Sequence, residues 1–112
     1  MSTDKNIHEL AEKIGQALAL TEEFQQKKEA EDLLRQDSAA RKLVKEFQNL
    51  KNSYERMEKM GHLLNDKNKA QLKAAEDKAL ANPIVKNWYD KTQDFYDLVI
   101  AVNGKMQEGI VN

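Results

Sequence analysis

The residues of this sequence with the most obvious capacity for chemistry are its two histidines and the carboxylates near them. His62 follows Glu58 by four positions, so a helix would carry both on one face, where they could supply part of a metal shell. A zinc site needs three or four protein ligands, and the other histidine, His8, has no ligand-like spacing to this pair. We therefore interpret Glu58 and His62 as an exposed polar pair at a helix end and expect no metal site.

Other catalytic patterns are also missing from the sequence. Di-iron helical bundles use paired Glu-x-x-His motifs, and none is present because Glu9 follows His8 directly. Ser38 and Ser53 have no histidine at a suggestive spacing, and no glycine-rich phosphate loop occurs. The chain contains no cysteine, which excludes disulfides, thiolate nucleophiles and Cys-held clusters within it. We expect no catalytic and no cofactor-binding residue, and a protein that is not an enzyme; a site assembled between subunits stays open.

The composition describes the elements that would carry any function. The 112 residues include 33% charged residues, one proline and four glycines, and large apolar residues recur at helical spacing. These features are typical of a helical bundle, and we expect one domain over residues 1–112 with residues 1–5 frayed. No apolar segment resembles a signal peptide or approaches 18 residues, so we expect a cytoplasmic protein without membrane insertion.

The longest predicted helix begins at Asn82 and Pro83. An asparagine side chain accepts a hydrogen bond from a free N–H of the first turn, and proline suits the first helical position because its missing N–H would be unpaired there. Apolar residues follow at alternating steps of three and four, with Thr92 as the one polar member, and the set is Val85, Trp88, Thr92, Phe95, Val99, Val102 and Met106. This spacing predicts a helix over residues 83–108 with a broad apolar stripe.

A second long helix is predicted over residues 38–63, with Asp37 as its N-cap and Gly61 in its last turn. Its apolar spacing is the same, through Ala40, Leu43, Phe47, Leu50, Tyr54 and Met57. Its length nearly equals that of the helix over 83–108. Together with shorter helices, these two predict an all-α, elongated helical bundle.

Three shorter helices complete the prediction. Asn6 is the expected cap of the first, which ends near Ala19. Thr21 is the expected cap of the second, with two glutamates in its first turn, where the positive helix end favours them. Asp66 is the expected cap of the fourth helix, over residues 67–81.

The stripe on residues 83–108 predicts self-association. It holds more large apolar residues than two short, alanine-rich helices can cover. The side chains that we expect to meet a second copy are Trp88, Phe95, Leu98, Val99 and Val102. A twofold homodimer is the commonest soluble assembly, so we expect a homodimer or a higher homo-oligomer. The alternative is a monomer whose short helices cover the whole stripe.

The middle of the chain is moderately basic. Residues 37–81 carry ten basic and seven acidic residues, while the whole chain has a net charge of −1. Interleaved signs are typical of a solvated, ion-paired helix face, so we expect no nucleic-acid partner. The alternative function is that of an RNA-contacting accessory protein that uses the basic 41–78 segment.

One set of residues resembles a known family over most of the chain, about 7 to 110. It comprises Glu23-Phe24, Ala30, Leu33-Leu34, Asp37-Ser38-Ala39-Ala40, Leu43-Val44, Phe47, Leu50, Gly61, Asn82-Pro83-Ile84-Val85 and Tyr89. In these residues the chain resembles the YlbF/YmcA family of small bacterial helical proteins, including its YheA-type members.

The resemblance implies a cytoplasmic, self-associating helical protein that regulates competence, sporulation or biofilm formation without being an enzyme. Some members join a third protein and act as specificity factors for a membrane-anchored ribonuclease that processes messenger RNA, which implies a protein partner in RNA processing. Some also use cysteines to hold iron–sulfur clusters. This chain has no cysteine, so we do not transfer cluster binding to it. The expected function is that of a homodimeric helical adaptor that acts through protein–protein contacts.

Overall fold

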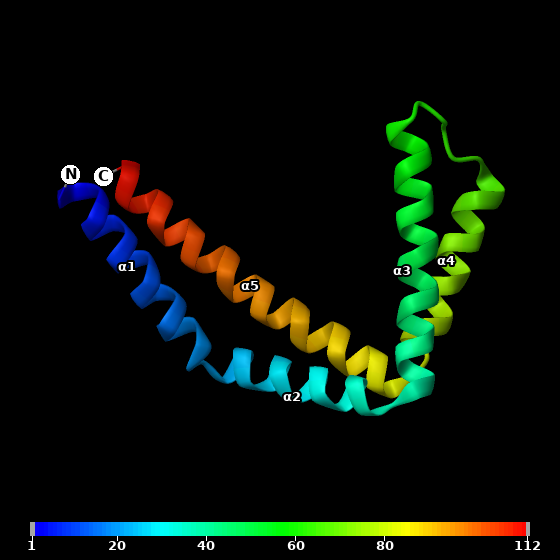
Figure 1. Ribbon diagram of the computed structural model, residues 1–112, viewed down its shortest axis with the longest axis horizontal. Coiled ribbons are helices and arrows are strands. Elements are labelled where there is room, and N and C mark those ends of the chain that lie inside the picture. The colour runs from blue at the N-terminus through cyan, green and yellow to red at the C-terminus, as the bar shows by residue number, and fades with distance from the viewer. Residues whose placement is uncertain (1, 112) are drawn as a thin grey trace. The chain divides into compact units, whose positions relative to one another are not determined.

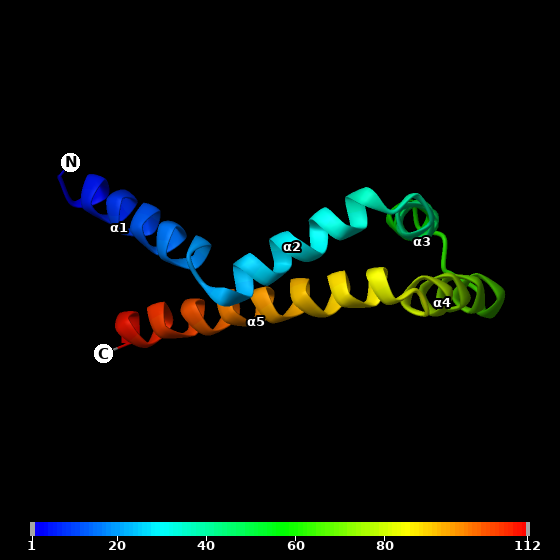
Figure 2. The same cartoon turned by 90° about the horizontal axis from the view of Figure 1, so that it is seen from below.

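The computed structural model describes residues 2–111, and within them it contains five helices and no strand (Figures 1 and 2). The helices are α1 (Ser2–Ala19), α2 (Glu22–Gln36), α3 (Ser38–Lys59), α4 (Asp66–Leu80) and α5 (Pro83–Val111). The all-α class is therefore confirmed. The two longest helices are α3, with 22 residues, and α5, with 29, as expected from the two long apolar stripes.

The chain forms two compact units. Unit 1 consists of residues 2–29 and 90–111, which hold α1, the first half of α2 and the C-terminal part of α5. Unit 2 consists of residues 30–89, which hold the rest of α2, all of α3 and α4, and the first turns of α5. That the chain is a single domain stays a prediction, and each unit is described by itself below.

Two predicted helix starts are confirmed in atomic detail. The Asn82 side-chain oxygen accepts hydrogen bonds from the backbone N–H groups of Ile84 and Val85, at 2.9 and 3.3 Å, directly before α5. The Thr21 hydroxyl accepts one from the backbone N–H of Phe24 at 3.2 Å, in the first turn of α2. These bonds pair donors that have no partner inside the helix, which is why each helix begins at that position.

The start of α3 is confirmed, but its predicted end is wrong. Asp37 accepts a hydrogen bond from the backbone N–H of Ala40 at 2.8 Å, as an N-cap does. The helix ends at Lys59 rather than at residue 63, because Gly61 takes a positive φ of 88°. The backbone N–H of His62 then donates to the Met57 carbonyl at 2.9 Å, which closes a Schellman motif and stops the helix.

The bounds of three helices differ from the prediction. The cap of α4 is Asn65 rather than Asp66, since Asn65 and Asn68 bond each other's backbone N–H in a reciprocal capping box. The first helix begins at Ser2, so Asn6 lies inside it and is not its cap. The last helix continues past residue 108 to Val111, so α3 and α5 are not of nearly equal length. That residues 1–5 fray stays a prediction.

The core of unit 2 is made of small residues. Ala40, Ala79 and Val85 are at most 4% exposed and come from α3, α4 and α5, so the three helices meet at this point. Partly buried side chains surround them, namely Leu34, Leu43, Val44, Leu80 and Ile84. Alanine at two of the three buried positions lets the helix backbones approach closely, but it buries little apolar area.

Three further contacts join helices within the two units. In unit 2 the buried Tyr54 hydroxyl donates to the Gln71 side-chain oxygen at 2.7 Å, which ties α3 to α4. In unit 1 the rings of Phe24 and Phe95 lie 5.4 Å apart between centroids, at 59° to each other. The Lys27 ammonium lies 5.9 Å from the centre of the Phe95 ring, within cation–π range.

Candidate functional site

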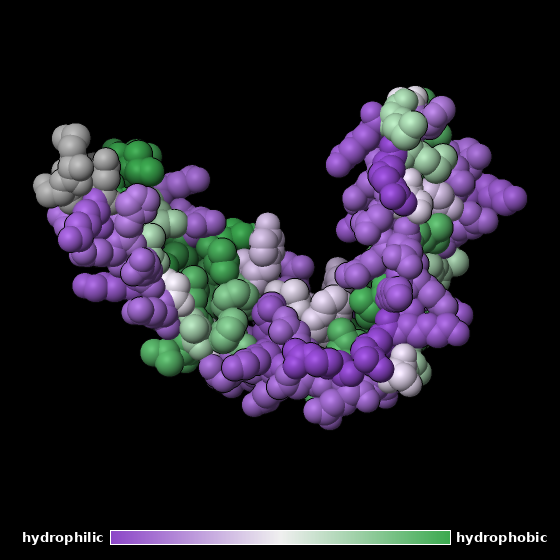
Figure 3. Space-filling view, viewed as in Figure 1, coloured by the Kyte–Doolittle hydropathy of each residue, from purple (hydrophilic) through white to green (hydrophobic). Residues whose placement is uncertain are grey.

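Unit 1 exposes large apolar side chains on both of its long elements. Ile7 and Leu10 of α1 are 58% and 59% exposed, and Tyr96 and Ile100 of α5 are 58% and 51% exposed. We name these four residues the unit 1 apolar surface. Figure 3 shows hydrophobic residues gathered over α1 and the C-terminal part of α5. Single exposed apolar residues are ordinary, but four large ones on two helices of one small unit favour an interaction with another protein.

The five residues predicted to self-associate do not lie in one unit. Phe95, Leu98, Val99 and Val102 belong to unit 1 and are half-buried. Trp88 is also half-buried but belongs to unit 2. That these five residues mediate self-association stays a prediction.

Tyr96 and Ile100 are more exposed than the five residues predicted to self-associate, and they were not among those five. The other predicted residues lie three, four or seven positions from Phe95 and so share its face of the helix. Tyr96 and Ile100 lie one and five positions after Phe95, on a different part of the helix surface. A signal for them was present, because the two apolar residues lie four positions apart and so share a face of α5.

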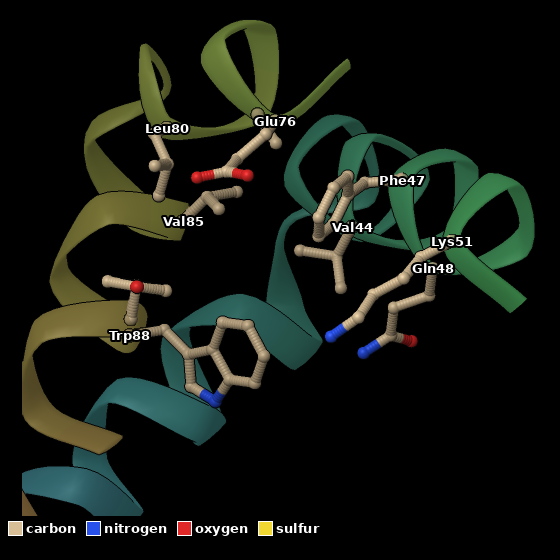
Figure 4. Close-up of a pocket in the computed structure, with 10 residues that line it drawn as sticks. Val44, Phe47, Gln48, Lys51, Glu76, Leu80, Val85 and Trp88 are labelled. Carbon is tan, nitrogen blue, oxygen red and sulfur yellow. The ribbon is translucent and has the colours of Figure 1, made fainter. Parts of the chain in front are cut away.

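Unit 2 contains an apolar groove where α3, α4 and α5 meet, with a volume of about 270 Å³. Val44 and Phe47 of α3 face it, and so do Leu80 of α4 and the aromatic pair Trp88 and Tyr89 of α5; Figure 4 labels all of these but Tyr89. We name it the unit 2 groove. It places the only tryptophan of the chain beside a neighbouring tyrosine that is 48% exposed.

Polar side chains line the same groove. Gln48 and Lys51 extend from α3, and Glu76 extends from α4 (Figure 4). Lys51 is exposed and makes no ion pair with any other residue of the described chain. The groove therefore combines an apolar lining with one basic and one acidic group on separate helices. Such a site can bind an apolar side chain of a ligand and select the charges beside it.

The residues considered for metal binding lie outside the groove, and of the basic residues in the 41–78 segment only Lys51 lines it. His62 follows the end of α3, so it does not share a helix face with Glu58 as the sequence analysis assumed. Within residues 2–111, no group of three or more His, Asp or Glu side chains is placed to hold a metal ion. Lys73 in the basic segment donates a hydrogen bond to Asp77 at 2.7 Å, and this bond raises the pKa of Lys73. None of the described helices has the length and hydropathy needed to cross a membrane.

Comparison with known proteins adds the family to this geometry. The family model described as "Control of competence regulator ComK, YlbF/YmcA" matches residues 7–111. A solved structure with the same fold is a protein of unknown function (DUF964) from Bacillus stearothermophilus, at a TM-score of 0.86 and 20% sequence identity. The match covers 94% of this chain and 92% of that one. No curated protein matches this sequence. The family match confirms the resemblance seen in the sequence: the chain belongs to the YlbF/YmcA family, which is described as a control of the competence regulator ComK.

Proposed function

We propose that this chain is a non-enzymatic regulatory protein that acts through protein–protein contacts and does so as a homodimer. The observation that carries the proposal is the unit 1 apolar surface, whose four side chains are each more than half exposed. The family's description as a control of a competence regulator supports a regulatory role. A regulator of this kind needs surfaces that bind other proteins, and it needs no reaction centre.

Burial of the exposed apolar area would offset about as much free energy as formation of a dimer costs. Complete burial of one large apolar side chain is worth about 1.5–3 kcal/mol, so the exposed half of each is worth about 0.8–1.5 kcal/mol. Four such residues in each of two protomers contribute about 6–12 kcal/mol. Association costs about 4–15 kcal/mol in lost translational and rotational freedom. The two quantities are similar, so contacts from the half-buried residues Phe95, Leu98, Val99 and Val102 would decide the affinity.

The test separates an adaptor from an RNA-contacting protein. The tagged chain is used to capture partners from its host, with and without nuclease, beside a Tyr96→Ser/Ile100→Ser double variant. An adaptor retains one or more proteins after nuclease treatment, and the double variant is expected to have a lower mass by light scattering.

If every captured protein disappears with nuclease, the RNA alternative replaces the adaptor proposal. In that case RNA binding should fall steeply with salt and weaken when Lys67, Lys69 and Lys73 are neutralised. Capture of no protein under either condition would reject the adaptor.

A further inference from the structure

We propose that the unit 2 groove binds an amphipathic helix of a partner protein, with apolar residues entering between Val44 and Trp88 and an acidic residue facing Lys51. The inference rests on the proposed function, since it assumes a regulator that works through protein contacts. It adds the place of contact and the chemistry of the partner, and of the five residues predicted to self-associate only Trp88 lines the groove.

The shape of the groove favours a helix as its occupant. Its α3 side is made by Val44, Phe47, Gln48 and Lys51, which lie at positions i, i+3, i+4 and i+7 of one helix. Such a row of side chains is the surface against which a second helix packs. The lining comes from helices only, so it offers no strand edge to an extended peptide. The volume of about 270 Å³ accommodates one or two large side chains rather than a bulky cofactor.

The residue types in the groove are those that dominate protein–protein interfaces. Tryptophan and tyrosine are enriched among the residues whose loss costs most binding energy, and Trp88 and Tyr89 stand next to each other here. Tyr89 is 48% exposed, which leaves about half of its area for a partner to cover. The small core of Ala40, Ala79 and Val85 holds the three helices below it, so the groove is largely formed before a partner arrives.

The charges around the groove specify the partner further. Lys51 is exposed and has no ion-pair partner among residues 2–111, so an acidic side chain of the incoming helix would complete a pair there. Glu76, on the opposite helix, would favour a basic side chain on the other flank of the partner. The expected occupant thus has an apolar stripe with an acidic residue on one side and a basic residue on the other. An exposed pair of this kind changes affinity by a factor of about two to five and mainly selects among partners.

The experiment uses a display library of 18-residue helical peptides, free of tryptophan and randomised on one face. The library is selected against the full-length chain, and binding of the selected peptides is then measured by the fluorescence of Trp88, the only tryptophan in the sequence. We expect enrichment of peptides that carry large apolar residues at i, i+3 or i+4, and i+7 with an acidic residue beside them. Replacing that acidic residue with lysine should weaken binding about two- to fivefold.

Matched variants of the chain show where the selected peptides bind. Lys51→Glu should reverse the charge preference, whereas Lys42→Glu, the same change on the other side of α3, should leave it unchanged. Tyr89→Asp should lower affinity at least tenfold and leave the chain's mass in solution unchanged. Tyr96→Asp, at a tyrosine of the unit 1 apolar surface that is 58% exposed, should lower the mass and leave peptide binding unchanged.

Four results would overturn the groove proposal, and the first three concern the selected peptides. They are no enrichment from the library, selected peptides that bind Tyr89→Asp as well as the native chain, and a charge preference that Lys51→Glu does not change. A Trp88 signal that varies with the concentration of the chain alone would identify a second copy as the occupant and would also overturn it. Because self-association is read from the mass of Tyr96→Asp, failure of the groove proposal and failure of the proposed homodimer are distinguishable.

Discussion

Replacing Ile100 with serine should weaken self-association without unfolding the protomer. Ile100 is 51% exposed, so about half of its area is free to be covered by a second copy. Complete burial of an isoleucine is worth about 1.5–3 kcal/mol, and the exposed half is worth about 0.8–1.5 kcal/mol. In a twofold dimer both copies lose this contribution, which gives about 1.5–3 kcal/mol in total. The dimer dissociation constant should therefore rise about 10- to 150-fold.

The measurement is sedimentation equilibrium or light scattering over a series of protein concentrations, with circular dichroism to verify that the helices persist. Leu63→Ser is the matched control. Leu63 is 92% exposed and lies in the connection between α3 and α4, in unit 2, so its loss should leave the dissociation constant unchanged. A native chain that remains monomeric throughout, or an Ile100→Ser variant within twofold of the native constant, would refute the reasoning. Phe95→Asp is a poorer test because Phe95 packs against Phe24, and a buried charge would also destabilise unit 1.

Three further predictions concern stability and are checked by thermal or urea unfolding. Asp37→Ala removes the side chain that accepts a hydrogen bond from the Ala40 N–H at 2.8 Å. The free energy of unfolding should fall by about 1 kcal/mol and the thermal midpoint by about 4 °C. An unchanged midpoint would mean that the cap contributes nothing to stability. Gly61→Ala should lower the free energy of unfolding by about 1–2 kcal/mol. The φ of 88° is strained for any residue with a side chain, although an added Cβ would meet no atom within 4 Å. An unchanged free energy would show that the connection between α3 and α4 relaxes to accept alanine. Tyr54→Phe removes the 2.7 Å hydrogen bond to Gln71 and should lower the free energy of unfolding by about 0.5–1 kcal/mol. The effect is small because Gln71 is exposed and can bond to water instead. A decrease of more than about 2 kcal/mol would contradict this reasoning.

The helices of this protein were largely predictable because their boundaries depend on short-range chemistry. Asn82, Thr21 and Asp37 each bond a backbone N–H two or three residues ahead, so their role is visible in the sequence itself. The errors have the same local scale. Asn65 rather than Asp66 caps α4 because it can exchange bonds with Asn68, and Asp66 cannot.

The candidate site was less predictable because it depends on helices distant in the sequence. The apolar spacing grouped Trp88 with Phe95 and Val99, yet Trp88 lines a groove with Val44 of α3 in unit 2, and Phe95 packs on Phe24 in unit 1. A periodic stripe shows that residues share a helix face. It does not show which neighbour covers each turn, because that neighbour comes from a segment many residues away.

Local sequence specifies the helical class, the helix order and the caps, because hydrogen bonds between residues two to five positions apart decide them. It also determined the family, through residues spread along the chain. Tertiary packing, in contrast, sets which side chains are covered. Tyr96 and Ile100 stay exposed while Phe95 and Val102 are half-buried, and α3, α4 and α5 leave a groove beside Trp88. The physical reason is that burial is a property of the whole packing arrangement, whereas a cap or a turn is a property of a few adjacent residues.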